Sequence, residues 1–191
     1  MRNRLREFLI AASRQSRSEM RSSMKFTKMQ GAGNDYVYVD CTQNELKNAS
    51  EVAVAVSDRH FGIGSDGLIL IKKSDKADFF MEMYNADGSQ GSMCGNGIRC
   101  VGKYAYDHGI VDKPQISVET LGGIKYLDMR IEGGKVKTVK VDMGIPQLTS
   151  ELPEKIQVDG KKLEFTGIDV GNPHAVYYVD DVDSLDLEKI G

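Results

Sequence analysis

The stretch 83–100 most constrains the fold, because it joins a strand pattern to a helix pattern through a polar, glycine-rich loop. The residues Phe79–Tyr84 have the apolar and aromatic content of a strand. An apolar helix is expected over Ile98–His108, and Gly109 supplies a typical C-terminal stop. The loop between them carries more hydrogen-bonding side chains than a connection needs: Asn85, Asp87, Ser89, Gln90 and Ser92. We therefore expect the loop to belong to a functional site.

Cys94 lies where this predicted helix begins. Backbone N–H groups in the first turn of a helix lack intrahelical partners and act together as a partial positive charge. A cysteine there is expected to lose its proton more readily than a free cysteine. Gly95 and Gly97 carry no side-chain bulk, so a ligand carboxylate can approach the same N–H groups. A thiolate beside an anion cradle suits removal of a proton next to a carboxylate.

The alternative for any free cysteine is a buried structural role, which is the more common one. We assign that role to Cys100, on the apolar face of the helix. His108 lies roughly 20 Å from Cys94 along the helix. It cannot act as the base for Cys94, which disfavours a protease-type Cys–His nucleophile.

Composition excludes several classes of function. The chain has 191 residues, of which 40% are hydrophobic and 28% charged, which is typical of one soluble domain or two small ones. A net charge of -3 gives no support to nucleic-acid binding, and no apolar run is long enough to cross a bilayer. The three cysteines form neither a disulfide framework nor a zinc-ligand spacing, which favours a cytoplasmic setting.

Residues 1–23 differ from the rest of the chain, being rich in arginine and serine. Leu5, Phe8, Leu9 and Ala12 could form one face of a helix. The segment is similar in composition to an organelle transit peptide. It also fits an upstream extension with Met24 as the working initiator, which we favour. In either case we expect a basic N-terminal extension that is disordered or peripheral.

The folded part is expected to begin near Lys25, with strands over 25–29 and 36–39 around a turn at 31–35. Asn34 is either a turn residue with positive φ or a polar group aimed at a ligand, and its spacing favours the turn. A helix is expected through 51–59, with Asn48 or Ser50 as its cap. A strand over 68–71 follows.

After the central helix we expect strands over 115–119, 125–131 and 136–141, the last two joined by a hairpin turn at Gly133-Gly134. The break at 142–146 could mark a domain boundary. Beyond it come strand patterns over 155–158, 163–166 and 168–179, the last interrupted by a polar turn at Gly171–His174, and a helix pattern over 182–190. Strands with so little helix to cover them predict an incomplete second domain. We therefore predict a first domain over 24–140 and the start of a second over 141–191.

Five motifs occur in one order from Met24 to the end of the chain. They are Gly31–Asp35, Asp58–Gly67, Tyr84–Ser89, Met93–Cys100 and Gly171–His174. Together they closely resemble diaminopimelate epimerases.

The resemblance implies a mixed α/β (α+β) fold of two pseudo-symmetric domains, each a curved sheet wrapped around a central helix. It implies that one α-carbon of L,L-diaminopimelate is inverted to give the meso form, without pyridoxal phosphate or metal. In the family, two cysteines lie on opposite faces of that carbon, one from each domain. One removes the α-proton as a thiolate, and the other delivers a proton as a thiol.

The resemblance implies site residues of this sequence, each matched to one position of the family's motifs. Cys94 matches the catalytic cysteine of the first domain. The substrate-binding positions are matched by Asn34, Asn85, Gly95, Asn96 and Asn172, and His174 belongs to the last motif in a supporting role. The expected partner is a small-molecule substrate, not nucleic acid or membrane, and a homodimer is compatible with the sequence.

Two departures from the family pattern leave alternatives open. Gly67 stands where some members carry a substrate-contacting glutamine. The second cysteine is absent, and it would fall in a stretch after Gly191, so we expect this chain alone to be inactive. A proline racemase or hydroxyproline epimerase is disfavoured because Asn96 replaces a histidine. A non-catalytic fragment stays open, because inversion needs an acid and a base.

Overall fold

The computed structural model describes residues 6–9, 23–158, 160–186 and 189. The chain divides into two compact units, Met1–Asp142 and Met143–Gly191, and each is described by itself. Within the described part, no helix is long and apolar enough to cross a membrane. That the two units are the two domains of the family stays a prediction.

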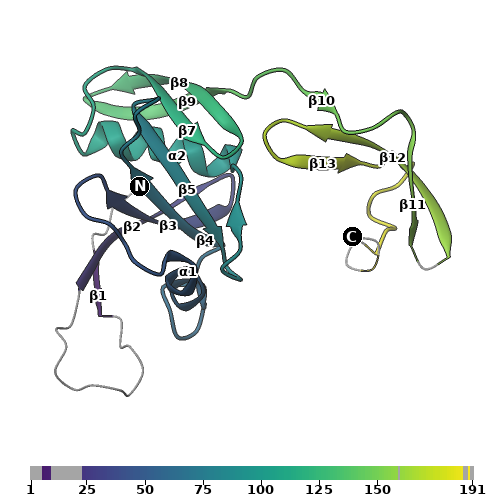
Figure 1. The fold of residues 1–191 in the computed structure, drawn as a ribbon, viewed down its shortest axis with the longest axis horizontal. Coiled ribbons are helices and arrows are strands. Elements are labelled where there is room, and N and C mark those ends of the chain that lie inside the picture. Colours follow the sequence, from purple (N-terminus) through teal and green to yellow (C-terminus); the bar gives the residue numbers. More distant parts are fainter. Residues whose placement is uncertain (1–5, 10–22, 159, 187–188, 190–191) are drawn as a thin grey trace. The chain divides into compact units, whose positions relative to one another are not determined.

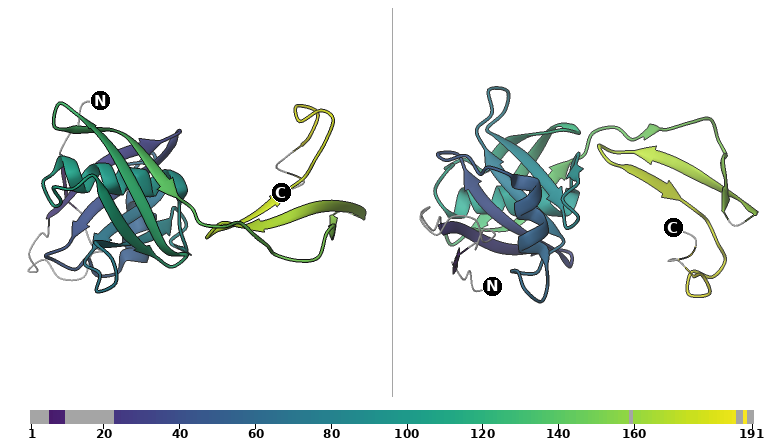
Figure 2. Two further views of the ribbon diagram at one scale, coloured as in Figure 1. Left: turned by 90° about the horizontal axis from the view of Figure 1, so that it is seen from above. Right: turned by 60° about the horizontal axis from the view of Figure 1, so that its bottom comes forward.

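Unit one is a mixed sheet that curves around a central helix (Figures 1 and 2). Its strand order is β1-β2-β3-β4-β5-β7-β8-β9, with β6 paired to β5. The pairs β3–β4 and β5–β7 are parallel, and the others are antiparallel. The predicted fold class is thereby confirmed. The strands are β1 (Arg6–Leu9), β2 (Ser23–Gly31), β3 (Asn34–Cys41), β4 (Gly67–Lys72), β5 (Phe79–Asn85), β6 (Gln90–Gly91), β7 (Gln115–Thr120), β8 (Gly123–Glu132) and β9 (Lys135–Asp142), and the helices are α1 (Ala49–Ser57) and α2 (Gly95–Asp107).

Helix α2 is the centre of the larger core. Its residues Ile98, Val101 and Ala105 are completely buried. They belong to one cluster with apolar side chains from β3, β4, β5, β7, β8 and β9. Because strands on both sides of the sheet's curve contact a single helix, burial of apolar area fixes α2 in place. The helix ends at Asp107, and Gly109 follows with φ 70, as the sequence predicts.

Helix α1 covers the other face of β2, β3 and β4, and forms a second core cluster with them. Side chains alternate along each strand, so Tyr36 and Tyr38 face α2 while Val37 and Val39 face α1. Strand β4 is buried in the same way on both faces. Burial on both faces explains why these strands appear in the sequence as continuous apolar runs rather than alternating patterns.

Of two local expectations in unit one, the cap of α1 is confirmed in position but not in bonding, and the helix expected near residues 5–12 is wrong where the structure describes it. Asn48 occupies the N-cap position of α1 in the left-handed conformation, φ 54, but its side chain makes no capping hydrogen bond. Ser50 Oγ instead donates to the carbonyl of Gly88, 2.7 Å away. Arg6–Leu9 forms a strand that pairs with β2, not a helix. Residues 1–5 and 10–22 lie outside the described part, so the predicted disorder of the extension stays a prediction there.

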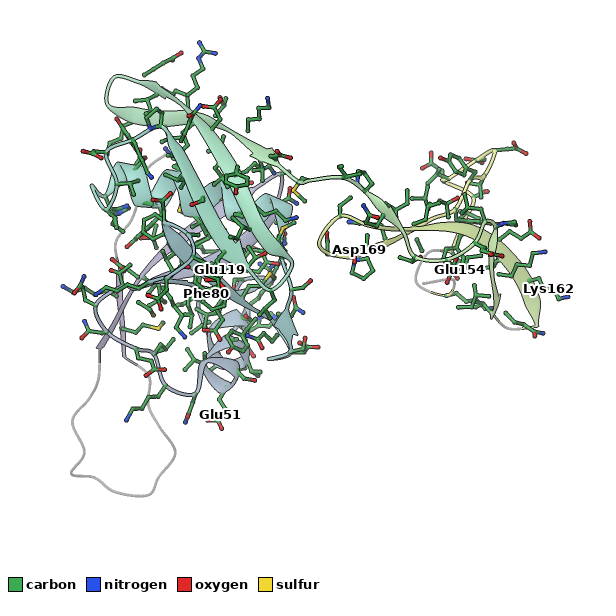
Figure 3. The ribbon with its side chains drawn as sticks, turned by 45° about the horizontal axis from the view of Figure 1, so that its top comes forward. Glu51, Phe80, Glu119, Glu154, Lys162 and Asp169 are labelled. Carbon is green, nitrogen blue, oxygen red and sulfur yellow. The ribbon has the colours of Figure 1, made fainter. Side chains whose placement is uncertain are left out.

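Unit two is a small antiparallel sheet of order β10-β12-β11, with β13 also paired to β12. Its strands are β10 (Gln147–Leu148), β11 (Glu154–Val158), β12 (Lys161–Asp169) and β13 (Pro173–Val176). Figure 3 marks Glu154 on β11 and Lys162 and Asp169 on β12. Three of the residues in the helix pattern over 182–190 lie outside the described part.

The packing of α2 gives a direct test of the core. Ile98 is completely buried in the cluster around α2, whereas Ile124 on β8 is 39% exposed. We expect Ile98→Ala to lower the free energy of unfolding by about 2–5 kcal/mol, because it removes buried contacts and leaves a cavity. Ile124→Ala makes the same chemical change and should cost less than about 1 kcal/mol. Urea unfolding measures both values, and equal losses would contradict the description of the core.

Candidate active site

Cys94 is the N-cap residue of α2, which confirms the predicted helix start. Its backbone is extended, φ -130 and ψ 112, and the helix begins at Gly95. The Cys94 sulfur is partly buried and accepts a hydrogen bond from the backbone N–H of Gly97, 3.3 Å away. The extended cap conformation turns the side chain back over the first helical turn, which is the usual geometry of a capping side chain.

Asn34 makes the second polar contact of the Cys94 sulfur. The thiol donates to Asn34 Oδ1 at 3.2 Å, and Asn34 Nδ2 donates to Asp66 Oδ2 at 2.7 Å. An ionised carboxylate can only accept, so the amide must turn its NH2 toward Asp66 and its oxygen toward the sulfur. Cys94 Sγ is therefore held between a donor on α2 and an acceptor on β3.

The favoured interpretation of Asn34 as a turn residue with positive φ is wrong. Asn34 is the first residue of β3 and pairs with Gly31. The left-handed positions of the turn are Ala32 and Gly33, with φ 53 and 87. Because the two preceding residues complete the reversal, the Asn34 side chain is free to point at the start of α2.

A charged cluster surrounds the Asp66 carboxylate. Arg59 Nη2 contacts Asp66 at 2.8 Å and Asp35 at 2.9 Å, and Lys28 contacts Asp35 at 2.9 Å. The backbone N–H of Asp35 also donates to Asp66 Oδ2, 3.0 Å away. Partial burial alone would raise the pKa of Asp35, but the bonds from Arg59 and Lys28 outweigh it and lower that pKa from 3.8 to about 2. The cluster ties the start of β3 to the loop before β4.

Tyr36 lies beside Cys94 and Asn34, and the sequence prediction gave it no role. Burial, and after it the neighbouring Cys94 side chain, raises the pKa of Tyr36 well above its ordinary value. The phenol therefore stays neutral and keeps a proton that it can donate. Neither Tyr36 nor the pair Arg59 and Asp66 could be found from local pattern, although the last two stand inside one of the motifs.

One hydrogen bond and two close approaches at glycines fix the position of the first turn of α2. Tyr38 OH donates to the carbonyl of Gly97 at 3.2 Å. A Cβ at Gly31 would lie 2.7 Å from the carbonyl oxygen of Asn96, and one at Gly97 would lie 2.7 Å from Ile69 Cδ1. Glycine at these two positions lets β2 and β4 contact the helix start directly. At Gly97 the lack of a side chain therefore serves packing.

The remaining predicted residues of unit one lie at the same end of the sheet. Asn96 is in the first turn of α2, and its Oδ1 accepts from Arg99 at 2.6 Å. Asn85 ends β5, and its Nδ2 donates to Ser89 Oγ at 3.0 Å. Register pairs Tyr36 with Gly67 and Gly67 with Asn85. Asn85 is therefore two strands, about 10 Å, from Tyr36.

Gly67 stands where no side chain fits. A Cβ there would collide with the carbonyl oxygen of Tyr84 and lie 2.9 Å from the Tyr36 ring. The close packing of β4 between its two neighbours thus explains why this position is a glycine.

Asn172 and His174 belong to unit two. Asn172 lies in the turn between β12 and β13, and its Oδ1 is 3.2 Å from His174 Nε2. His174 falls within β13 and pairs with Ile168, so the polar turn is shorter than the sequence predicts. The two side chains support each other within their own unit.

Solved structures show which fold this chain shares. A hydroxyproline epimerase from Agrobacterium vitis, solved with bound trans-4-hydroxy-L-proline, has a TM-score of 0.64 at 15% identity, over 81% of this chain and 51% of that chain. A probable proline racemase from Agrobacterium radiobacter K84 also has a TM-score of 0.64, at 14% identity, over 85% and 54%. At these identities the likeness shows the fold alone, which is that of the proline racemase-like proteins.

Sequence comparison then identifies the family. The profile described as Diaminopimelate epimerase matches residues 26–149. A diaminopimelate epimerase from Acetivibrio thermocellus is 55% identical over 179 residues, which cover 88% of this chain and 64% of that protein. One from Methanococcus maripaludis strain S2 is also 55% identical, over 88% and 65%. The chain belongs to the diaminopimelate epimerase family. It spans about two thirds of the length of these relatives, 64% and 65%.

The charged cluster predicts a pH-dependent stability. The pKa of Asp35 is lowered from 3.8 to about 2, so its ion pairs stabilise the fold above about pH 4 and are lost as the pH falls through about 2. We expect Asp35→Asn to lower the free energy of unfolding by about 1–2 kcal/mol at neutral pH, allowing for the exposure of Arg59. Urea unfolding from pH 7 down to pH 2 measures the difference, which should shrink to a small part of its neutral-pH value at the acid end. A difference that stays constant with pH would contradict the assignment.

Proposed function

We propose that the protein to which this chain belongs is a diaminopimelate epimerase, which interconverts L,L- and meso-diaminopimelate in the synthesis of lysine and peptidoglycan precursors. Membership of the family supports the substrate. The single observation that carries the chemistry is the partly buried Cys94 at the start of α2, bonded to both Asn34 and Gly97. We also propose a cytoplasmic location and action without pyridoxal phosphate or a metal.

Cys94 is the residue proposed to exchange a proton with the α-carbon. As a thiolate it takes the α-proton, so that the C–H bond breaks, an S–H bond forms, and the electron pair stays on the carbon beside the carboxylate. A second acid then protonates the carbon from the opposite face, which inverts it. Family resemblance implies that this acid is a cysteine from the second domain. In the reverse direction the Cys94 thiol is the donor, so both protonation states must be accessible.

The start of α2 supports binding of the substrate's α-carboxylate. The first intrahelical bond runs from the N–H of Ile98 to the carbonyl of Cys94, and the N–H of Gly97 is bonded to the sulfur. The N–H groups of Gly95 and Asn96 precede these donors and have no intrahelical acceptor. An anion next to Cys94 would find them oriented toward it, together with the positive end of the helix dipole.

Side-chain amides complete the proposed substrate site. Asn34 and Asn85 lie at the same end of the sheet in unit one, and Asn172, with His174 beside it, is proposed to contribute from unit two. Amides offer both donors and acceptors, which suits a substrate carrying ammonium and carboxylate groups at both ends. The proposed partner is this small molecule, and a homodimer is compatible with the proposal.

The test uses the full-length enzyme in deuterated water. We expect Cys94→Ala to lower both epimerisation and incorporation of deuterium at the α-carbon by about 10²–10⁴-fold, because general acid–base catalysis is lost. Cys41→Ala is the matched control, since Cys41 is buried in the core cluster around α1 and should leave the rate within about twofold. Normal epimerisation by Cys94→Ala would rule out its proposed role. Turnover of proline isomers in place of diaminopimelate would favour the racemase alternative.

A further inference from the structure

The orientation of the Asn34 amide depends on a residue that does not itself reach Cys94. Asp66 Oδ2 accepts from Asn34 Nδ2 at 2.7 Å and from the backbone N–H of Asp35 at 3.0 Å. Its other oxygen accepts from Arg59 at 2.8 Å. Three donors from two segments, the start of β3 and the loop after α1, therefore hold this carboxylate. It presents to Asn34 a charged acceptor in a fixed position, which is the stronger kind of hydrogen-bond partner.

The fixed orientation of the Asn34 amide favours one protonation state of the Cys94 sulfur over the other. Asn34 Oδ1 lies 3.2 Å from Cys94 Sγ and accepts its proton. After ionisation the same oxygen would face a thiolate, two acceptors with no hydrogen between them. Turning the amide to offer its NH2 to the thiolate would break the bond to Asp66 and place an oxygen against a carboxylate. The Gly97 N–H, in contrast, favours the thiolate.

We propose that Asp66 is a positioning residue that, through the Asn34 amide, holds Cys94 in its thiol form in the ligand-free protein. The proposal rests on the proposed function only for its catalytic meaning: Cys94 must be able to exist in both forms, and Asp66 sets the balance between them. The geometry does not depend on which substrate is turned over. The single observation behind it is the chain of bonds from Arg59 to Asp66, Asn34 and Cys94.

Two tyrosines of β3 face the sulfur, and Cys100 lies further along α2. The Tyr36 hydroxyl is hydrogen-bonded to both Cys94 and Asn34, so, like the Gly97 N–H, it favours the thiolate and opposes the effect of Asp66. Burial raises the pKa of each of these three groups, so all three are neutral near neutral pH. The charged groups near the start of α2 include Lys28, Asp35 and Arg59 of the cluster around Asp66, and Arg99, which is bonded to Asn96.

The test measures alkylation of each cysteine by iodoacetamide in the ligand-free protein at neutral pH, followed by peptide mass spectrometry. The reagent reacts with the thiolate. We expect Asp66→Ala to raise the rate at Cys94 by about three- to tenfold, the value of one ordinary hydrogen bond, here that of the thiol to the amide oxygen. The buried Cys41 and Cys100 must stay slow, which shows that the fold is intact. Asp66→Asn is the milder variant and should change the rate in the same direction.

Asp35→Ala is the matched control. It removes the same charge from the same cluster and also frees Arg59, but the Asp35 side chain does not contact the Asn34 amide. We expect it to leave the Cys94 rate within about twofold. In an Asn34→Ala background, Asp66→Ala should give no further rise, because the residue through which it acts is gone.

Three results would overturn the proposal. They are an unchanged Cys94 rate in both Asp66 variants, an equal rise in Asp35→Ala, or a full additional rise in the Asn34→Ala background. Labelling needs no substrate, so its outcome is separate from that of the proposed function. An enzyme inactive toward diaminopimelate would leave the positioning role standing, and an active one could still contradict it.

Discussion

The chemistry proposed for this site depends on the contacts of Cys94 Sγ with one donor and one acceptor. Gly97 N–H donates to the sulfur from α2, and Asn34 Oδ1 accepts its proton from β3. The first contact favours a thiolate and the second a thiol. A group that must both take and give a proton in a reversible reaction is well served by two opposing contacts of modest strength.

Packing of the fold holds those two contacts in place. The sheet curves around α2, and side chains from strands β3, β4, β5, β7, β8 and β9 bury the helix. Tyr38 and Gly31 then fix the first turn of the helix against β2 and β3. Because β3 begins and β5 ends at that same end of the sheet, the amides of Asn34 and Asn85 lie around the helix start. Packing of the core thereby brings the amides and Cys94 together, although these polar groups have no strong attraction for one another.

Much of this could be predicted from the sequence. The strand, polar loop and apolar helix around Cys94 predict a cysteine at a helix start, and the structure confirms it. The apolar runs of β3 and β4 predict buried strands. What local pattern could not supply is contact across long separations: Asn34 and Cys94 are 60 positions apart, and Asn34 and Asp66 are 32 apart. The interpretation of Asn34 as a turn residue is wrong because Ala32, not Asn34, adopts the left-handed conformation. At the start of α1, Asn48 is the N-cap residue as expected, but its side chain makes no capping bond, and Ser50 binds the distant Gly88 instead.

The infrared S–H stretching band of Cys94 tests the central contact most directly. It is isolated as the difference between spectra of the ligand-free protein and of Cys94→Ser. We predict the band of a hydrogen-bonded thiol, which returns to the position of a free thiol when Asn34→Ala removes the acceptor. A missing band would mean that Cys94 rests as a thiolate. A band that Asn34→Ala leaves unchanged would mean that the amide oxygen does not hold the proton. Either result would contradict the assignment of Asn34 as the acceptor.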